Sequence, residues 1–308
     1  MADEKLRLAR LRSNLERRAQ LFELTRRFFR QQGYLEVDTP VLAPAVAPEL
    51  NIIPMESEGW YLAASPELHM KRLLAAGYER IFQISRSFRR GERGRWHNPE
   101  FSLLEWYRAG AGYLDMMDDT AGLVRFVAGE LGLGDEINYQ GQAIDLGLPW
   151  PQVTVSSLFL EHAGWDPAAA YDSARFDDDM ALKILPALPA GRPLIMLDYP
   201  APAASLARLK KSDARLAERA EVYIGGLELA NAYSELTDAA EQRQRFLDEI
   251  AAIRAQRGKK MPLPESFLEA VGHMPECGGI ALGMDRLTML FCDAARIDEV
   301  IAFSAETA

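Results

Sequence analysis

Two strand-like segments on either side of an arginine-rich loop constrain the fold of this chain most. Residues 81–88 (IFQISRSF) and 101–107 (FSLLEWY) are rich in apolar and aromatic residues, and the short loop between them predicts two antiparallel neighbours. The other strand-like segments follow one another or follow hairpins, without regular alternation of strand and helix. This order favours an α+β fold with an antiparallel sheet flanked by helices.

The remaining segments predict one domain over residues 1–308. Residues 15–32 have the apolar periodicity of an amphipathic helix. Residues of about 114–220 are expected to be a mostly helical insertion. From Gly278 onward, we expect a glycine-rich turn that runs into a helix.

Composition limits the class of protein. A chain of 308 residues with a formal net charge of −10 can bury a sizeable core and is not typical of a general nucleic-acid binder. Two cysteines, Cys277 and Cys292, are too few for a disulfide framework and fit a reducing compartment. Because the N-terminus is charged and no apolar run approaches about 20 residues, we expect a cytoplasmic protein without a membrane span.

The loop after residue 88 concentrates positive charge in an acidic chain. It holds four arginines within seven residues, namely Arg89, Arg90, Arg93 and Arg95. The planar guanidinium group matches phosphate oxygens, and an aromatic ring such as that of Phe101 can stack on a purine. A triphosphate site is one interpretation and a solvated basic loop is the other, and the sequence has no Walker P-loop.

Carboxylates recur on strand faces that are otherwise apolar. Residues two apart on a strand share a face, which groups Glu105 with Tyr107 and, in LELANAYSEL, Asn231 with Tyr233 and Glu235. A buried carboxylate without a partner is costly, so such faces suggest a pocket for a metal ion or an ammonium group. The alternative is that these strands lie at edges and the carboxylates are solvated.

Four segments resemble the catalytic domain of class II lysyl-tRNA synthetases and, within that group, the elongation factor P lysine ligase family. They are RRFFRQQGYLEVDTP (motif 1), ASPELHMKRLLAAGYERIFQISRSFR with HNPEFSLLEWY (motif 2), ERAEVYIGGLELANAYSELTDAAEQ, and GGIALGMDRLTMLF with EVIAFS (motif 3). Together they cover nearly the whole chain. The resemblance implies a class II synthetase fold and the use of ATP and Mg²⁺.

The resemblance also implies roles for single residues. Arg89 would hold the α-phosphate and the amino-acid carbonyl, and Arg286 would cover adenine and contact the γ-phosphate; both are the catalytic candidates. The ATP site would be completed by His97, Phe101 and Glu92, and magnesium would be held by Glu221 and Glu228. The lysine pocket would consist of Glu67, Glu105, Tyr107, Asn231, Tyr233, Glu235 and Ala281.

The implied function is ATP-dependent activation of lysine or (R)-β-lysine as an adenylate, followed by transfer to a lysine side chain of elongation factor P. A different acceptor (tRNA, a carrier protein or a small molecule) and a non-catalytic lysine sensor are the alternatives. Only a short helical stretch precedes motif 1, so we expect no anticodon-binding domain and consider tRNA a poor acceptor. The family also implies a homodimer that forms through the motif 1 region.

Two positions depart from the lysyl-tRNA synthetase pattern. Gly91 occupies the position of the glutamate that reads the adenine amino group, and Glu92 follows one residue later. Ala281 replaces a glycine, as it does in the elongation factor P ligases. The additional methyl group would affect which lysine isomer fits. The difference in binding free energy between the isomers would be roughly 1–3 kcal/mol at most.

Overall fold

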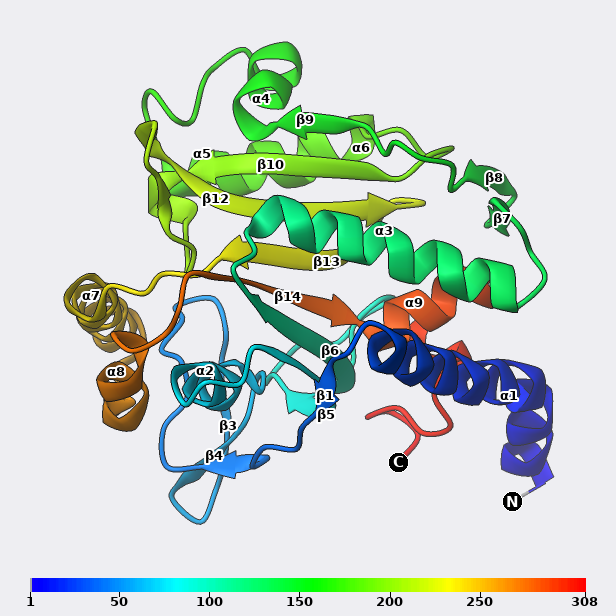
Figure 1. Ribbon diagram of the computed structural model, residues 1–308. Helices are drawn as coiled ribbons and strands as arrows, with labels where there is room; N and C mark the ends of the chain where they lie inside the picture. Colours follow the sequence, from blue (N-terminus) through cyan, green and yellow to red (C-terminus); the bar gives the residue numbers. More distant parts are fainter. Residues whose placement is uncertain (1) are drawn as a thin grey trace.

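The computed structural model describes residues 2–308, and Met1 of the predicted domain lies outside the described residues. Within this range a nine-stranded sheet forms the centre, in the order β1-β5-β6-β14-β13-β12-β10-β9, with β11 paired to β12 (Figure 1). Strands β5 to β10 of this order are antiparallel, whereas β1 and β9 run parallel to their neighbours. The predicted α+β fold with a helix-flanked antiparallel sheet is confirmed.

The strands of this sheet are β1 (Leu35–Glu36), β5 (Arg80–Phe88), β6 (Glu100–Ala109), β9 (Gln152–Thr154), β10 (Leu194–Pro200), β11 (Leu209–Lys210), β12 (Asp213–Ile224), β13 (Leu227–Ser234) and β14 (Cys277–Gly283). Two small sheets hold β2 (Leu42–Ala43), β3 (Met55–Ser57) and β4 (Trp60–Leu62), and β7 (Glu136–Tyr139) and β8 (Gln142–Asp145).

The α-helices are α1 (Ala2–Gln31), α2 (Glu67–Ala75), α3 (Tyr113–Glu130), α4 (Val155–Ala163), α5 (Ser173–Asp179), α6 (Leu185–Ala187), α7 (Ala239–Arg257), α8 (Glu265–Val271) and α9 (Met284–Phe291), with short 3₁₀ and π turns at 180–184, 201–203 and 297–299. No helix within residues 2–308 combines the length and apolar character that crossing a membrane requires.

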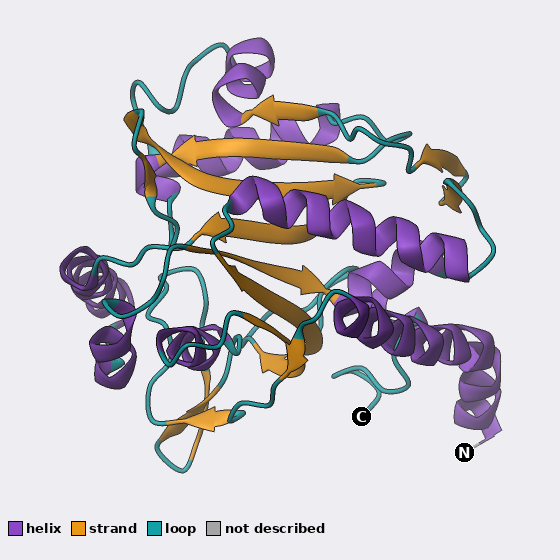
Figure 2. Cartoon of the chain, in the orientation of Figure 1, coloured by secondary structure: helices purple, strands orange, loops and turns teal. Residues whose placement is uncertain are grey.

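One face of the sheet packs against α1, α3 and α9 (Figures 1 and 2). Phe29 of α1 stacks on Phe82 of β5, with ring centroids 4.9 Å apart, and lies 5.0 Å from the ring of Trp106 on β6. Trp106 and its face-mate Leu104 are fully buried in this core. Because strand side chains alternate between faces, the residues between them point to the opposite side of the sheet.

The expectation that residues 114–220 are mostly helical is wrong. This segment holds α3 to α6, but it also contributes β7 to β11 and most of β12. Residues Leu194–Pro200 form strand β10, and all of them except Leu197 are buried. Because both faces of this strand are covered, its sequence does not show the alternation of polar and apolar residues that identifies a half-buried strand.

The expectation of a turn at Gly278 is also wrong. Cys277–Gly283 forms β14, which lies between β6 and β13 near the centre of the sheet. A Cβ atom on Gly278 would lie only 2.8 Å from the carbonyl oxygen of Gly112, which leads into α3. Glycine is therefore present here because another backbone segment approaches closely, and not because the chain turns.

Candidate active site

The face of the sheet opposite α3 carries a row of mainly polar residues. Strand pairing places Gln83, Glu105, Ala281, Asn231 and Glu221 side by side on β5, β6, β14, β13 and β12. Four of these five side chains can form hydrogen bonds, so this part of the sheet is built to contact a polar ligand.

A second row lies beside the first. It runs from Ile81 through Tyr107, Gly279 and Tyr233 to Arg219 on the same five strands. The predicted grouping of Glu105 with Tyr107, and of Asn231 with Tyr233, on common faces therefore holds in the structure. The missing side chain at Gly279 leaves space that Tyr107 and Glu235 occupy.

A β-bulge brings Glu228 onto this face. Glu221 pairs with Asn231 and Val222 with Ala230, but Tyr223 then pairs with Glu228, which leaves Leu229 as an extra residue on β13. Such an extra residue reverses the alternation of side chains along the strand. Glu228 consequently lies on the same face as Glu221, and the two carboxylates interact electrostatically.

Three carboxylates, one ammonium group and one tyrosine hydroxyl form a buried cluster, which we call the carboxylate pocket: Glu67, Lys71, Glu105, Tyr107 and Glu235. The Lys71 Nζ atom lies 2.6 Å from Oε1 of Glu67 and 2.5 Å from Oε2 of Glu235. The Tyr107 hydroxyl donates to Oε2 of Glu105 at 2.8 Å. Lys71, Glu105 and Glu235 are each 1% exposed, so solvent does not balance their charges.

Burial and neighbouring carboxylates raise the pKa values of two carboxyl groups in this pocket. Burial, with a further contribution from Glu67, raises the pKa of Glu235 to about 7 although Lys71 opposes the shift. Burial and the charge of Glu67 likewise raise the pKa of Glu105 well above its usual range. A carboxylate whose pKa is raised in this way gains stability from an added cation, so the pocket favours an ammonium ligand.

Gly279 forms the floor under Glu235 and Tyr107. A Cβ atom at this position would lie 2.1 Å from Oε1 of Glu235 and 2.3 Å from Cε1 of Tyr107. Real Cβ atoms do not approach other atoms this closely, so a larger residue would displace one of the two side chains. The carboxylate pocket therefore depends on a glycine in the middle of β14.

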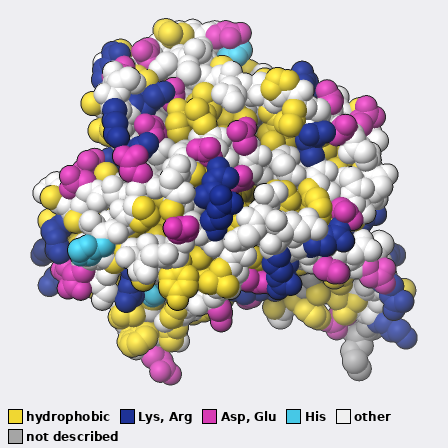
Figure 3. All heavy atoms as spheres, in the orientation of Figure 1, with side chains coloured by type: hydrophobic (Ala, Val, Ile, Leu, Met, Phe, Trp, Pro, Cys, Tyr) yellow, Lys and Arg dark blue, Asp and Glu magenta, His cyan; other side chains and the backbone are white. Residues whose placement is uncertain are grey.

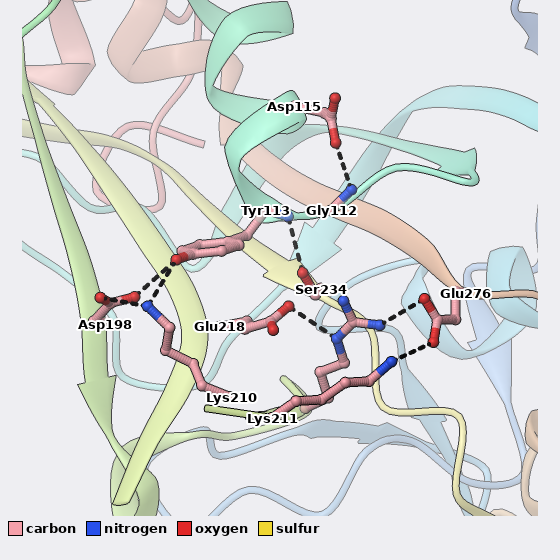
Figure 4. A network of polar contacts seen from close by, with 10 residues as sticks. Gly112, Tyr113, Asp115, Asp198, Lys210, Lys211, Glu218, Ser234 and Glu276 are labelled. Carbon is pink, nitrogen blue, oxygen red and sulfur yellow. Dashed lines mark hydrogen bonds and ion pairs between the residues drawn. The ribbon is translucent and has the colours of Figure 1, made fainter. Parts of the chain in front are cut away.

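Figure 4 shows a polar network around Ser234, the last residue of β13, which precedes Glu235 in the sequence. The Ser234 hydroxyl accepts from the backbone N–H of Tyr113, and the Tyr113 hydroxyl donates to Asp198, which is also paired with Lys210. The backbone N–H of Glu235 donates to the carbonyl of Cys277 on β14. These contacts hold the chain at Ser234 and Glu235, next to the carboxylate that lies over Gly279.

A hollow of about 340 Å³, which we call the arginine pocket, adjoins this row. Its lining includes eight of the predicted site residues: Arg89, Glu92, His97, Phe101, Glu228, Asn231, Ala281 and Arg286. The Arg89 guanidinium lies 5.1 Å from the centre of the Phe101 ring and 3.7 Å from Glu92. A larger, open hollow of about 710 Å³ between α2, α8 and residues 38–40, which follow β1, is lined by none of the predicted residues.

Arg286 contacts both Glu228 and His97 in the arginine pocket. Its Nη1 atom donates to the carbonyl of Glu228 at 2.6 Å, and its Nη2 atom lies 2.7 Å from Nε2 of His97. Because arginine donates only, Nε2 of His97 accepts and the imidazole is neutral. Burial and the charge of Arg286 lower the pKa of His97, which agrees with a neutral ring.

The arginine loop is attached to the C-terminal segment. The Asn98 side chain accepts from the backbone N–H of Ala305, and the Arg95 side chain donates to the carbonyl of Ala295. Gly91 has a φ of +80°, a value that favours glycine, and Glu92 follows it into the pocket lining. Gly91, which occupies the position predicted to read adenine, therefore lies in a turn. Glu92 is the residue of this loop whose carboxylate lines the pocket.

Glu221 and Glu228 suit a magnesium ion only in part. Both oxygens of Glu221 have partners, with Arg219 at 2.7 Å and Tyr223 at 2.5 Å. Burial and the charge of Glu221 raise the pKa of Glu228, although Arg286 lies 3.5 Å from its carboxylate and opposes the shift. Within residues 2–308 no group of three or more acidic, histidine or cysteine side chains could hold a metal. Magnesium often binds through one or two carboxylates together with substrate phosphates, which fits this pair.

Several residues that shape the site were missed from the sequence: Gly279, Lys71, Arg219, Glu49 and Asn98. The four-residue spacing of Glu67 and Lys71 on a helix could have predicted their ion pair. Burial and the charge of Glu67 raise the pKa of Glu49 to about 7, which places this loop residue near the carboxylate pocket. Nothing in the local sequence marks Glu49 or Asn98.

Comparison with known proteins gives consistent matches over the whole chain. The model of the family "tRNA synthetases class II (D, K and N)" matches residues 4–307. A protein of Edwardsiella ictaluri named elongation factor P–(R)-β-lysine ligase is 41% identical, and the match covers 96% of each chain. Proteins of the same name from Pectobacterium carotovorum and Sodalis glossinidius are 40% and 37% identical over the same shares.

Replacement of Gly279 by alanine tests the floor of the carboxylate pocket. We expect Gly279→Ala to lower the free energy of unfolding by about 1–3 kcal/mol, because Glu235 or Tyr107 must move. Gly129→Ala is the control, because nothing lies within 4 Å of its added Cβ and it sits in helix α3. It should leave stability unchanged or raise it by up to about 1 kcal/mol. Urea titration measures the free energy of unfolding of both variants. Equal losses of stability would contradict the close contacts inferred at Gly279.

Proposed function

Because the chain belongs to the class II tRNA synthetase family (D, K and N), we propose that it activates lysine or (R)-β-lysine with ATP and transfers it to a lysine side chain of elongation factor P. The relatives that match over 96% of their length carry the name of this ligase. The enzyme is accordingly a ligase, and the aminoacyl-adenylate is its intermediate.

The observation that carries this proposal is the junction of the two pockets. Ala281 and Asn231 line the arginine pocket and belong to the strand row that contains Glu105. An amino acid with its amines among the carboxylates would extend past these two residues and direct its carboxylate toward Arg89. This is the arrangement that joining an amino acid to a nucleotide requires.

The first step forms a bond between a substrate carboxylate oxygen and the α-phosphorus of ATP, and pyrophosphate leaves. The reacting groups are anionic, so Arg89 and Arg286 would reduce their repulsion and stabilise the charge of the transition state. His97 is neutral and held by Arg286, so it would donate a hydrogen bond to phosphate through its protonated Nδ1 or orient Arg286. Phe101 would stack on the adenine and Glu92 would accept from its amino group.

Glu221 and Glu228 would hold Mg²⁺, which neutralises phosphate charge when it is bound. Arg219 and Tyr223 donate hydrogen bonds to the two oxygens of Glu221 and orient it. In the second step, the unprotonated amine of the acceptor lysine attacks the carbonyl carbon of the adenylate. An amide forms, AMP leaves with the bonding electrons, and the amine loses its proton.

We assign (R)-β-lysine as the preferred isomer because of Ala281. Its methyl group lies beside Glu105 and Asn231, where the amine and carboxylate of the substrate would meet. Moving the amine from the α to the β carbon would leave room for this methyl group. The name of the relatives also specifies (R)-β-lysine.

We propose that the acceptor is a protein and not tRNA. The formal net charge is −10, and tRNA binding relies on concentrated positive charge. On the face of the described chain that Figure 3 shows, Lys and Arg side chains are mixed with Asp and Glu and form no continuous basic stripe.

We further propose one domain, a homodimer and a cytoplasmic location. Four large apolar side chains near motif 1 are at least 38% exposed and would be covered by a second copy: Leu35, Val41, Leu42 and Trp60. Both cysteines are free, as in reducing compartments.

Sedimentation velocity tests the homodimer. The wild type should sediment as a dimer, and a Val41→Lys variant should sediment as a monomer. A wild-type monomer at micromolar concentration would contradict the proposed homodimer.

ATP–pyrophosphate exchange tests the activation step. We expect exchange with (R)-β-lysine to exceed exchange with L-lysine, and none without an amino acid. Arg89→Ala should lower kcat by about 100- to 1,000-fold, because charge on the α-phosphoryl group is no longer balanced. Arg93→Ala, which removes an exposed arginine of the same loop, is the control and should retain activity. Exchange with neither isomer would contradict the proposal, and exchange with L-lysine alone would favour another acceptor.

Mass spectrometry of the acceptor tests the transfer step. Incubation with elongation factor P, ATP and (R)-β-lysine should add one β-lysyl group to its loop lysine, and an acceptor with arginine there should remain unmodified. Parallel incubation with tRNA should give no charged product. Charging of tRNA without modification of elongation factor P would contradict the proposed acceptor.

A further inference from the structure

Lys71 is among the largest fully buried side chains of the described residues. Its ammonium group lies between Glu67 of its own helix and Glu235, which follows β13. Burying a charged group is costly unless the charge is paired, and replacing such a cluster by apolar residues often stabilises a protein. A role in the site would explain why the charge is present.

Lys71 stays charged in this environment. Burial alone lowers its pKa, but Glu235 and Glu67 outweigh burial, and the net pKa lies well above the usual value. The titratable or charged groups that face Glu235 are few: Glu67 and Lys71 of α2, Glu105 and Tyr107 of β6, and Cys277 of β14. Lys71 is the one cation among these five groups.

The charges of the pocket can therefore be counted. Glu67, Glu105 and Glu235 contribute three negative charges when ionised, and Lys71 contributes one positive charge. Glu49 is outside this count, because Arg89 and Arg219 oppose its charge. The remaining two negative charges equal the charge of two ammonium groups. Oε1 of Glu235 lies over Gly279, while Oε2 contacts Lys71. One oxygen is thus used internally, and the other would be the one to accept from a ligand.

We propose that Lys71 is a positioning residue that acts as an internal counter-ion, setting the charge of the carboxylate pocket to match a substrate with two ammonium groups. This inference rests on the proposed function, because it assumes that the pocket binds lysine or (R)-β-lysine. Without Lys71, one carboxyl group would have to keep a proton when such a substrate binds. Lys71 acts through Glu67 and Glu235 and does not touch the reacting atoms.

The pH dependence of KM tests this role. Lys71 lowers the pKa of Glu235, so a neutral residue at this position raises that pKa and shifts ionisation to higher pH. Lys71→Met and Lys71→Gln should raise the KM for (R)-β-lysine at pH 7 by about tenfold or more. The pH at which 1/KM increases should be higher than in the wild type by about one unit. The difference from wild type should shrink toward pH 9, and the KM for ATP should stay unchanged.

Lys71→Arg is the matched control, since it retains the charge and should keep the wild-type pH profile. Lys71→Gln can still donate hydrogen bonds to both carboxylates, so it separates charge from local structure if Lys71→Met does not fold. A uniform rise in KM at every pH would show a packing role and overturn the proposal. Absence of exchange by the wild type with either isomer would instead refute the proposed function.

A measurement on the wild type tests the charge count without any variant. Titration calorimetry at pH 7 in two buffers of different ionisation enthalpy measures the protons released on binding. (R)-β-lysine should release protons from Glu105 and Glu235, and 6-aminohexanoate, with one ammonium group, should release fewer. Equal release by both ligands would overturn the proposed match of charges.

Discussion

The excess of buried carboxylates over buried cations is the constraint on which the site depends. Glu105 and Glu235 lie almost without solvent on one face of the sheet, and Lys71 balances only part of their charge. This arrangement costs stability in the free protein, and a cationic ligand recovers it. The core on the other face, where Phe29 packs against Phe82 and Trp106, supplies the rigidity that holds such a site in place.

The two pockets differ in how the sheet builds them. The carboxylate pocket lies over β14, where Gly279 leaves space for Glu235 and Tyr107. The arginine pocket is completed by a loop that Asn98 and Arg95 attach to the C-terminal segment. In the proposed mechanism, the floor at Gly279 would help to select the amino acid, and the attached loop would present Arg89 to the phosphates.

Local patterns in the sequence predicted the faces of the strands but not their order. Period-2 spacing correctly grouped Glu105 with Tyr107 and Asn231 with Tyr233. The insertion of β14 between those strands was missed, because pairing over long sequence separations leaves no local pattern and its glycines suggested a turn. Lys71 was missed for a similar reason, since Glu235 is distant in the sequence. The assigned roles of the site residues remain predictions that rest on the family resemblance.

A crystal structure with a sulfamoyl-adenosine analogue of (R)-β-lysine tests the central claim most directly. The account predicts that both amines lie among Glu67, Glu105 and Glu235, while the adenine stacks on Phe101. It also predicts that the acyl group passes Ala281 and that the Lys71 contacts remain in place. An analogue that binds with its amines outside the carboxylate pocket, or that displaces Lys71 from Glu235, would contradict the account.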